Sequence, residues 1–420
     1  MQPKNVVMLL LMRQRVLSYC ILLFPLLFID SRINGQNLGF YFEKDQKRVT
    51  VPFELHNNLI ILPITFNEKY PLKFILDTGV RSTILLDKEF MDALGIKYQR
   101  KIELFGIGDT TSVTALVAGN VSLSMPGIKS SEISILVLER DFLNLEKHLG
   151  TKIHGIIGYE LFSRFVIKID YLNQKIVLYQ HANFKANKKY DVIDLDIYET
   201  KPYVNLPLQL NSTDSVSVRL MVDTGASHAL ILNSNSHEKI TIPKVNIETK
   251  LGRGLTGEIN GRLGRIEGLH FGKKRLVDVI VSFPDQGKVE SIYQKNGSIG
   301  GELLKKYTVI FDFFKGKMYL KSNATFKYPF EYNMSGLEFL VEGENLNQFV
   351  IHHIREKSAA SGVGFETGDL IVSLNNIPAR KLTLTKIYTN LNLKNGKKIN
   401  LTVSRDGKYI SKSFSLRREI

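Results

Sequence analysis

The tripeptide Asp-Thr-Gly occurs twice in this chain, at residues 77–79 and 223–225. Apolar runs flank both copies, so each aspartate is expected to follow a buried strand and to lie in a tight turn. Two carboxyl groups that face each other cannot easily both ionise, and they can share one proton. A shared proton is the basis of acid–base hydrolysis by paired carboxylates. The pattern therefore predicts that Asp77 and Asp223 form such a pair.

The similarity between the two halves extends well beyond the tripeptide. Further blocks match in the same order: 62–64 with 206–208, 106–108 with 252–254, 155–162 with 297–304, 169–171 with 311–313, and 175–178 with 317–320. The aspartates and the glycine-rich blocks have the same offset of 146 residues (223 − 77 and 252 − 106). Short β-branched and aromatic runs alternate with Gly, Asn and Pro turns throughout both halves, which indicates a mostly β fold. The chain therefore contains a duplicated lobe.

These blocks, in this order, resemble the retropepsin-like aspartic peptidases of the pepsin clan, here fused into a single-chain pseudo-dimer. The resemblance covers roughly residues 45–325. The chain is similar to bacterial exported members, many of them from the Bacteroidota, that carry a C-terminal PDZ domain. The resemblance implies two homologous retropepsin-like β-barrel lobes followed by an α+β PDZ domain. We expect a signal peptide at 1–36, lobe 1 at 37–182, lobe 2 at 183–326 and the PDZ-like domain at 330–416.

The resemblance also implies how the paired acids act. Asp77 and Asp223 would hold a water molecule, with the charged carboxylate as general base and the protonated one polarising the scissile carbonyl. The residues expected to support the two loops are Thr78, Gly79, Thr224, Gly225, Gly158 and Gly300. The threonines would tie the loops together by hydroxyl hydrogen bonds. Gly79 and Gly225 would donate backbone N–H groups to the carboxylates, and the other two glycines would pack behind the loops.

Two glycine pairs lie where the family has its flap hairpins, which bend over a bound peptide. They are Gly106 and Gly108 in the first half, and Gly252 and Gly254 in the second. Glycine permits the backbone angles that such hairpins require. An ordinary glycine turn is the alternative at these positions. His228 has no counterpart in the first half, so we expect a surface or packed histidine there.

The first loop departs from the family pattern at Val80 and Arg81. Val80 is bulkier than the usual Ala or Ser. An inward Arg81 would favour the ionised form of the pair and lower its titration range, but we expect Arg81 to point to solvent. The alternative to a peptidase is a non-catalytic exported peptide-binding or scaffold protein with a relic fold. An active site needs both carboxylates within hydrogen-bonding reach, whereas a relic would tolerate a splayed or plugged pair.

The C-terminal part resembles a PDZ domain, with the carboxylate loop at Gly336, Leu337, Glu338 and Phe339. A PDZ domain binds an extended peptide by adding it to a sheet edge, backbone to backbone. Glu338 stands where the family has a second glycine. An acid there could repel a peptide carboxylate, which disfavours capture of a free C-terminus.

The N-terminus is typical of an export signal. Arg13 and Arg15 precede the apolar run 16–29, which is too short for a spanning helix and suits the core of a signal peptide. A retained anchor is the alternative, and membrane contact is expected only through this segment if it stays uncleaved. We therefore predict an exported protein of the periplasm or cell envelope.

The composition of the chain limits which partners and cofactors we expect. The 420 residues carry a net charge of +15, but the Lys and Arg are scattered, so we expect no nucleic-acid partner. The single cysteine, Cys20, lies in the signal segment, which excludes cysteine chemistry in the mature protein. We predict no metal and no cofactor. The expected partners are polypeptide substrates or peptide ligands, and the expected state is a monomer.

Overall fold

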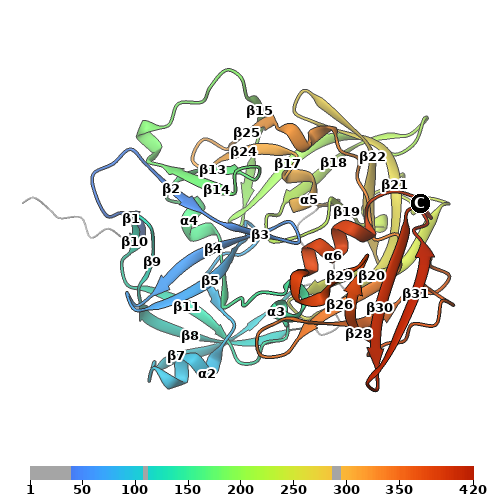
Figure 1. Cartoon of the computed structure of the whole chain (residues 1–420). Coiled ribbons are helices and arrows are strands. Elements are labelled where there is room, and N and C mark those ends of the chain that lie inside the picture. Colours follow the sequence, from blue (N-terminus) through green and yellow to red (C-terminus); the bar gives the residue numbers. More distant parts are fainter. Residues whose placement is uncertain (1–38, 107–111, 286–294) are drawn as a thin grey trace, which may run out of the picture. The chain divides into compact units, whose positions relative to one another are not determined.

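The structure, a computed structural model, describes residues 39–106, 112–285 and 295–420. The predicted signal peptide (residues 1–36) and Gly108 lie outside these residues. About half of the described residues are in strands, which form four β-sheets, and the helices are few and short; this confirms the mostly β fold (Figure 1). No helix among the described residues is long and apolar enough to cross a membrane.

Lobe 1 is built on an 11-stranded sheet with the order β1-β10-β9-β4-β5-β12-β6-β11-β8-β7, and β3 pairs with β4. The strands are β1 (Phe40–Phe42), β3 (Glu54–His56), β4 (Leu59–Phe66), β5 (Tyr70–Leu76), β6 (Ile84–Leu85), β7 (Tyr98–Leu104), β8 (Val113–Val121), β9 (Leu123–Met125), β10 (Ile128–Ser130), β11 (Ile133–Leu138) and β12 (Gly155–Ile157). The α-helices are α2 (Lys88–Ala93), α3 (Leu145–Leu149) and α4 (Tyr159–Phe162).

Lobe 2 is built on an 8-stranded sheet with the order β16-β17-β18-β23-β19-β22-β21-β20. The strands are β16 (Asp196–Tyr198), β17 (Lys201–Gln209), β18 (Ser215–Val222), β19 (Leu230–Leu232), β20 (Asn246–Gly254), β21 (Gly257–Phe271), β22 (Lys274–Pro284) and β23 (Gly297–Ile299), and the helix is α5 (Gly301–Leu304).

The two lobes repeat the same topology. The order β4-β5-β12-β6-β11-β8-β7 in lobe 1 corresponds strand by strand to β17-β18-β23-β19-β22-β21-β20 in lobe 2. In both, the strand that precedes the Asp-Thr-Gly loop pairs in parallel with a short strand, β5 with β12 and β18 with β23. The repeated sequence blocks therefore fold into repeated structures.

A third sheet is shared by the two lobes. Its order is β15-β25-β24-β13-β14-β2, with β2 (Arg48–Pro52), β13 (Val166–Asp170), β14 (Lys175–Tyr179), β15 (Asp191–Asp194), β24 (Tyr307–Asp312) and β25 (Lys317–Ser322). Antiparallel pairing of β13 with β24 joins the lobes, with Ile167 opposite Phe311. Phe162 packs on the same seam, 5.4 Å from the Phe311 ring and 5.1 Å from the Phe313 ring between centroids.

The C-terminal sheet has the order β26-β27-β28-β30-β31, and β29 pairs with β28. Its elements are β26 (Leu337–Glu342), β27 (Gln348–Ile354), β28 (Leu370–Leu374), β29 (Ile377–Pro378), β30 (Lys398–Arg405), β31 (Lys408–Ser415) and α6 (Leu384–Leu391). Short 3₁₀ helices lie at η2 (His181–Asn183), η3 (Ser234–Ser236), η4 (Ala324–Lys327) and η5 (Ala379–Lys381). Arg265 of β21 donates to the Phe330 carbonyl at 3.1 Å, which ties lobe 2 to the segment leading into this domain.

We predict that the aromatic seam between the lobes is a main determinant of stability. Phe162 is 1% exposed, so Phe162→Ala should lower the free energy of unfolding by about 3–5 kcal/mol through lost burial and a cavity. Leu172→Ala is the matched control, because Leu172 is 53% exposed and should change stability by only about 0.5 kcal/mol. Urea unfolding followed by circular dichroism measures both. A loss for Phe162→Ala as small as that of the control would contradict the prediction.

Candidate active site

Each Asp-Thr-Gly loop begins where a buried strand ends. Asp77 follows β5 and its backbone N–H donates to the Ile157 carbonyl at 2.8 Å. Asp223 follows β18 and its N–H donates to the Ile299 carbonyl, also at 2.8 Å. These bonds continue the parallel pairing of β5 with β12 and of β18 with β23. The two aspartates therefore leave their strands at equivalent points with equivalent backbone support.

The two threonines hold the loops together across the pseudo-two-fold relation. The Thr78 N–H donates to the Thr224 hydroxyl at 3.1 Å, and the Thr224 N–H donates to the Thr78 hydroxyl at 3.1 Å. Each hydroxyl in turn donates to a carbonyl of the opposite lobe, Thr78 to Val222 at 2.6 Å and Thr224 to Leu76 at 2.8 Å. Both side chains are fully buried. The reciprocal bonds fix the spacing of the aspartates that precede them.

The two carboxyl groups lie side by side. Gly79 N–H donates to Asp77 Oδ1 at 2.6 Å, and Gly225 N–H donates to Asp223 Oδ1 at 2.9 Å. The two carboxyl groups are close enough for each to shift the pKa of the other. A Cβ at position 225 would lie 2.2 Å from Asp77 Cγ, and one at position 79 would lie 3.8 Å from Asp223 Oδ1. Glycine at 225 is therefore what lets the Asp77 carboxyl reach across to lobe 2.

Burial raises the pKa of both acids. The pKa of Asp77 lies well above its ordinary value, first because of desolvation and then because of the neighbouring charge of Asp223; the Gly79 N–H opposes the rise. Burial also raises the pKa of Asp223, against the Gly225 N–H and the ammonium groups of Lys295 and Lys201. A pair of this kind keeps a proton at a pH at which an exposed aspartate is ionised.

Gly158 and Gly300 leave no room for a side chain behind the loops. A Cβ at Gly158 would lie 1.9 Å from the Asp77 carbonyl oxygen, and one at Gly300 would lie 2.3 Å from the His228 carbonyl oxygen. Real side chains do not approach the backbone this closely, so both positions require glycine. His228 itself contacts Ser298 Oγ at 3.0 Å, and burial lowers its pKa to about 4. It is a packed, neutral histidine behind the loop.

The two departures of the first loop from the family pattern are an arginine at the surface and a packed valine. Arg81 is exposed. Val80 is half-buried and packs against an apolar cluster of lobe 1 that includes Ile75, Ile84 and Leu138. Neither residue brings a charge into the protein interior beside Asp77.

The glycine-rich block of lobe 2 forms the end of a long hairpin. β20 and β21 pair up to Gly254 and Gly257, with a bulge between Lys250 and Gly252, where φ is +144° at Gly252. Such a φ favours glycine. The bulge and the glycines at the end of the ladder let this hairpin bend.

The tip of that hairpin reaches lobe 1. Thr256 is 2% exposed and its hydroxyl lies 3.4 Å from the Gly106 carbonyl oxygen. Leu255 packs on the same apolar cluster as Val80, and Arg253 Nε donates to the Phe142 carbonyl at 2.8 Å. Gly106 thus meets the lobe 2 hairpin, while Gly108 lies outside the described residues.

Sequence reasoning did not single out Arg253, Leu255 or Thr256 as bridging residues, nor Lys201 and Lys295 as cations near the acids. The one available signal was that Arg253 interrupts the glycines of lobe 2, where lobe 1 has Ile107. The lysines carry no local pattern, since they reach the acids only through the tertiary fold. Among the described residues, no three or more His, Cys, Asp or Glu side chains are placed to hold a metal ion.

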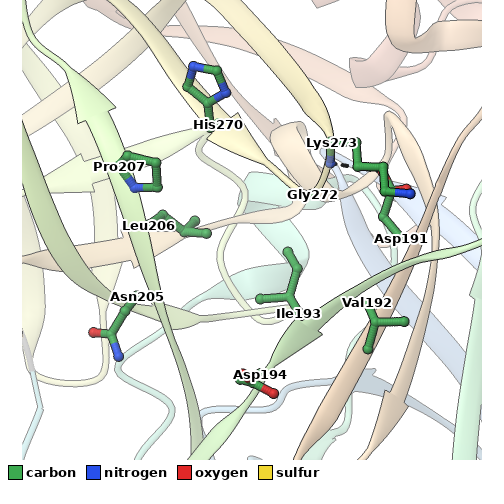
Figure 2. A pocket seen from close by; sticks show the side chains of 10 residues that line it. All are labelled: Asp191, Val192, Ile193, Asp194, Asn205, Leu206, Pro207, His270, Gly272 and Lys273. Carbon is green, nitrogen blue, oxygen red and sulfur yellow. Dashed lines mark hydrogen bonds between the residues drawn. The ribbon is translucent and has the colours of Figure 1, made fainter.

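A cavity of about 600 Å³ lies elsewhere on lobe 2 (Figure 2). It is lined by Asp191, Val192, Ile193, Asp194, Asn205, Leu206, Pro207, His270, Gly272 and Lys273. Lys273 N–H donates to Asp191 Oδ2 at 2.9 Å at its edge. Neither aspartate of the pair lines this cavity, so it is separate from the candidate active site.

We predict that the threonine bonds stabilise the lobe junction. Thr224→Val keeps the shape but leaves the Thr78 N–H and the Leu76 carbonyl without their partner, which should lower the free energy of unfolding by roughly 2–5 kcal/mol. Thr224→Ser keeps the hydroxyl and loses one methyl group, so it should cost about 1 kcal/mol. Urea titration measures the free energy of unfolding of both variants. Equal losses of stability in Thr224→Val and Thr224→Ser would rule out a dominant role for the hydroxyl.

We also predict that the raised pKa of Asp77 makes the stability of the fold depend on pH. The pKa of Asp77 is raised in the folded state, so folding favours the protonated acid. The wild-type protein should lose stability as pH rises from the ordinary Asp range through this raised pKa. Asp77→Asn cannot ionise, so it should gain stability relative to wild type over that window. Asp45→Asn, at an exposed position, is the control. Thermal melting across pH gives the comparison, and parallel profiles for Asp77→Asn and wild type would contradict it.

Family models match parts of both lobes and the C-terminal domain. Residues 62–161 and 206–303 match the family model of the aspartyl protease, and residues 335–416 match that of the PDZ domain. No curated protein matches the chain. Among solved structures, the crystal structure of an aspartic proteinase from Irpex lacteus aligns over 67% of this chain and 99% of that chain, with 11% identity and a TM-score of 0.43. The two family-model matches contain both Asp-Thr-Gly loops. By these matches, the chain contains two repeats of the retropepsin-like aspartyl protease family, followed by a C-terminal PDZ domain.

Proposed function

We propose that the protein is an aspartic-type endopeptidase that hydrolyses peptide bonds with a water molecule activated by Asp77 and Asp223. The observation that carries the proposal is the pair of half-buried carboxyl groups. Each accepts a glycine N–H, and Asp77 reaches so far toward lobe 2 that a Cβ at position 225 would lie 2.2 Å from its Cγ. A relic fold that only binds peptides would tolerate splayed acids. The close, matched pair supports catalysis over that alternative.

In the proposed reaction, the two carboxyl groups hold one proton between them, so one acts as the base and the other as the acid. The ionised carboxylate takes a proton from water as the water oxygen attacks the peptide carbonyl carbon. The protonated carboxyl donates its proton to the carbonyl oxygen, giving a neutral tetrahedral diol. Collapse of the diol breaks the C–N bond. The protonated carboxyl gives its proton to the leaving amine, while the ionised carboxylate takes a proton from a diol hydroxyl as the product carboxyl group forms, so the pair again holds one proton. Glycine N–H bonds to Asp77 and Asp223 keep both acids oriented throughout.

We propose that the PDZ domain binds polypeptide by strand addition to β26. β26 stands at the end of its sheet, with β27 as its strand partner in the described chain. Glu338 is half-buried near the start of β26, opposite His353 of β27, and burial raises its pKa against the nearby charges of His353, Lys250 and Arg355. An acid in this loop disfavours a terminal carboxylate, so internal peptide segments are the proposed ligands.

We further propose that the protein is exported to the periplasm or cell envelope of a bacterium and acts as a monomer. The proposal rests on the basic and apolar pattern of residues 1–36 and on a single chain that supplies both aspartates. Cell fractionation with an antibody to the mature chain tests export, and a cytoplasmic pool of uncleaved protein would contradict it.

We predict that Asp77→Asn and Asp223→Asn each reduce peptide cleavage to background without unfolding the protein, because the two acids act as a unit. Wild-type cleavage should fall as pH rises through the raised pKa of the pair, since the proton-donating form is then lost. The assay incubates the chain from residue 37 with a peptide library from acidic to neutral pH and identifies products by mass spectrometry. Asp45→Asn is the control with normal activity. The proposal is falsified if either dyad variant retains near-normal hydrolysis.

A further inference from the structure

The edge of the PDZ sheet to which a peptide would add is already in contact with other parts of the chain. Tyr388 of α6 accepts a hydrogen bond from the Phe339 N–H at 3.2 Å, and the two rings lie 6.0 Å apart between centroids. The Phe339 N–H is one of the β26 donors that a strand-adding peptide would need. A ligand must therefore displace the Tyr388 hydroxyl at this point.

A segment of lobe 1 lies farther along the same strand. Helix α3 packs against β26, and Gly150, which ends this helix at a φ of +67°, lies between β26 and the start of α6. A Cβ at position 150 would lie 3.3 Å from Val341 Cγ2 and 3.6 Å from Leu384 Cβ. Val341 and Leu384 are both buried. The lobe 1 segment thus covers the part of β26 beyond Phe339.

The same segment contacts the lobe 2 hairpin. Burial lowers the pKa of His148 on α3, and the next causes are the charges of Arg253 on the hairpin and His352 on β27. Arg253 also donates to the Phe142 carbonyl, three residues before α3 begins, at 2.8 Å. Lys250 and Glu258 form an ion pair at 3.0 Å at the base of the hairpin tip. One small junction therefore joins α3, the β20–β21 hairpin and the PDZ sheet.

The hairpin tip closes on lobe 1 beside the first Asp-Thr-Gly loop. Leu255 and Val80 belong to the same apolar cluster, and Val80 is three residues from Asp77. Thr256 is buried against Gly106. Flap hairpins of this kind must move for a polypeptide to enter, because a closed flap excludes both water and substrate. Because Arg253 of the hairpin is bonded to the Phe142 carbonyl, contacts that hold α3 and Phe142 in position also stabilise the closed hairpin.

We propose that residues 145–150 of lobe 1 are an internal ligand of the β26 edge, and that this docking holds the β20–β21 hairpin closed. A polypeptide that adds to β26 displaces the internal segment, loosens the junction at Arg253 and lets the hairpin open. The PDZ domain then couples recruitment to opening of the cleft. The effect on cleavage rests on the peptidase function proposed above. The docking of residues 145–150 on β26 does not depend on that function.

An internal ligand is a strong competitor. A tethered segment experiences an effective concentration in the millimolar range for its own site. Short peptides that bind weakly should therefore open the cleft only rarely and be cleaved slowly, whereas an unfolded protein with a well-matched segment should open it. The device would favour cleavage of polypeptides that engage the PDZ domain first.

A disulfide lock tests the docking. Gly150→Cys with Leu384→Cys places two Cβ atoms about 3.6 Å apart, within the range of natural disulfides of roughly 3.5–4.5 Å. The full chain is used with Cys20→Ser, which removes the native thiol. Each single cysteine variant is a control for the positive φ at residue 150 and for the loss of Leu384. Thiol titration before and after mild oxidation reports the cross-link, and failure to form it in the folded protein would overturn the docking.

Binding and cleavage are then measured on the locked and the reduced protein. The binding probe is a fluorescent mixture of random decapeptides, and the cleavage probe is unfolded casein. We expect the locked form to bind the peptides at least fivefold more weakly and to cleave casein at least fivefold more slowly than the reduced form, with no redox effect in the single variants. Equal binding in both forms overturns the internal ligand. Normal casein cleavage by the locked form overturns its control of the cleft. If neither form nor the parent cleaves casein, the peptidase proposal fails, and the binding arm still decides the docking.

Arg253→Ala provides a second test that needs no cross-link. It removes the hydrogen bond to Phe142 without touching the acids, so casein cleavage should rise several-fold while hydrogen exchange at the hairpin amides becomes faster. Arg262→Ala, on the other strand of the same hairpin, is the matched control. Unchanged exchange in Arg253→Ala would show that this contact does not hold the hairpin.

Discussion

The structure depends on the reciprocal hydrogen bonds of two buried threonines. Thr78 and Thr224 each bind the backbone of the opposite loop, so neither loop can take its position alone. This constraint brings two acids into a desolvated space where their like charges oppose full ionisation. The threonine bonds and the glycine N–H groups offset the cost of burying polar groups, because the buried groups remain hydrogen-bonded. The chemistry proposed for the pair follows from that single arrangement.

Because the lobes are duplicated, each supplies one Asp-Thr-Gly loop with the same backbone support. The sheet that both lobes share joins them through the pairing of β13 with β24. The halves are nonetheless unequal where the cleft is covered. Gly225 admits the Asp77 carboxyl, whereas Gly79 leaves more room before Asp223. Lys201 and Lys295 act on the acids from the lobe 2 half of the chain, and the long β20–β21 hairpin of lobe 2 reaches across to Gly106. Asymmetry of this kind lets one half control access while both halves support the acids.

Repetition made much of this molecule predictable from sequence. Because the two Asp-Thr-Gly loops and the blocks behind them share one order, the duplicated lobes could be inferred before any coordinates, and the PDZ domain followed from its own blocks. The contacts of Leu255 with lobe 1 and of Gly150 with Val341 could not be predicted. These contacts join residues that are distant in the sequence. Among the described residues they have no counterpart in the other repeat, and the residues that make them belong to no recognisable sequence motif.

The central claim is that Asp77 and Asp223 share one proton in a half-buried site, and titration of the two carboxyl groups tests it most directly. Carbon-13 labelling of the aspartates would allow each carboxyl carbon to be followed by NMR from acidic to neutral pH, with Asp77→Asn and Asp223→Asn used to assign the signals. The account predicts that both carbons respond together in two steps, with the upper step well above the ordinary Asp range. Two independent titrations at ordinary Asp pKa values would contradict it.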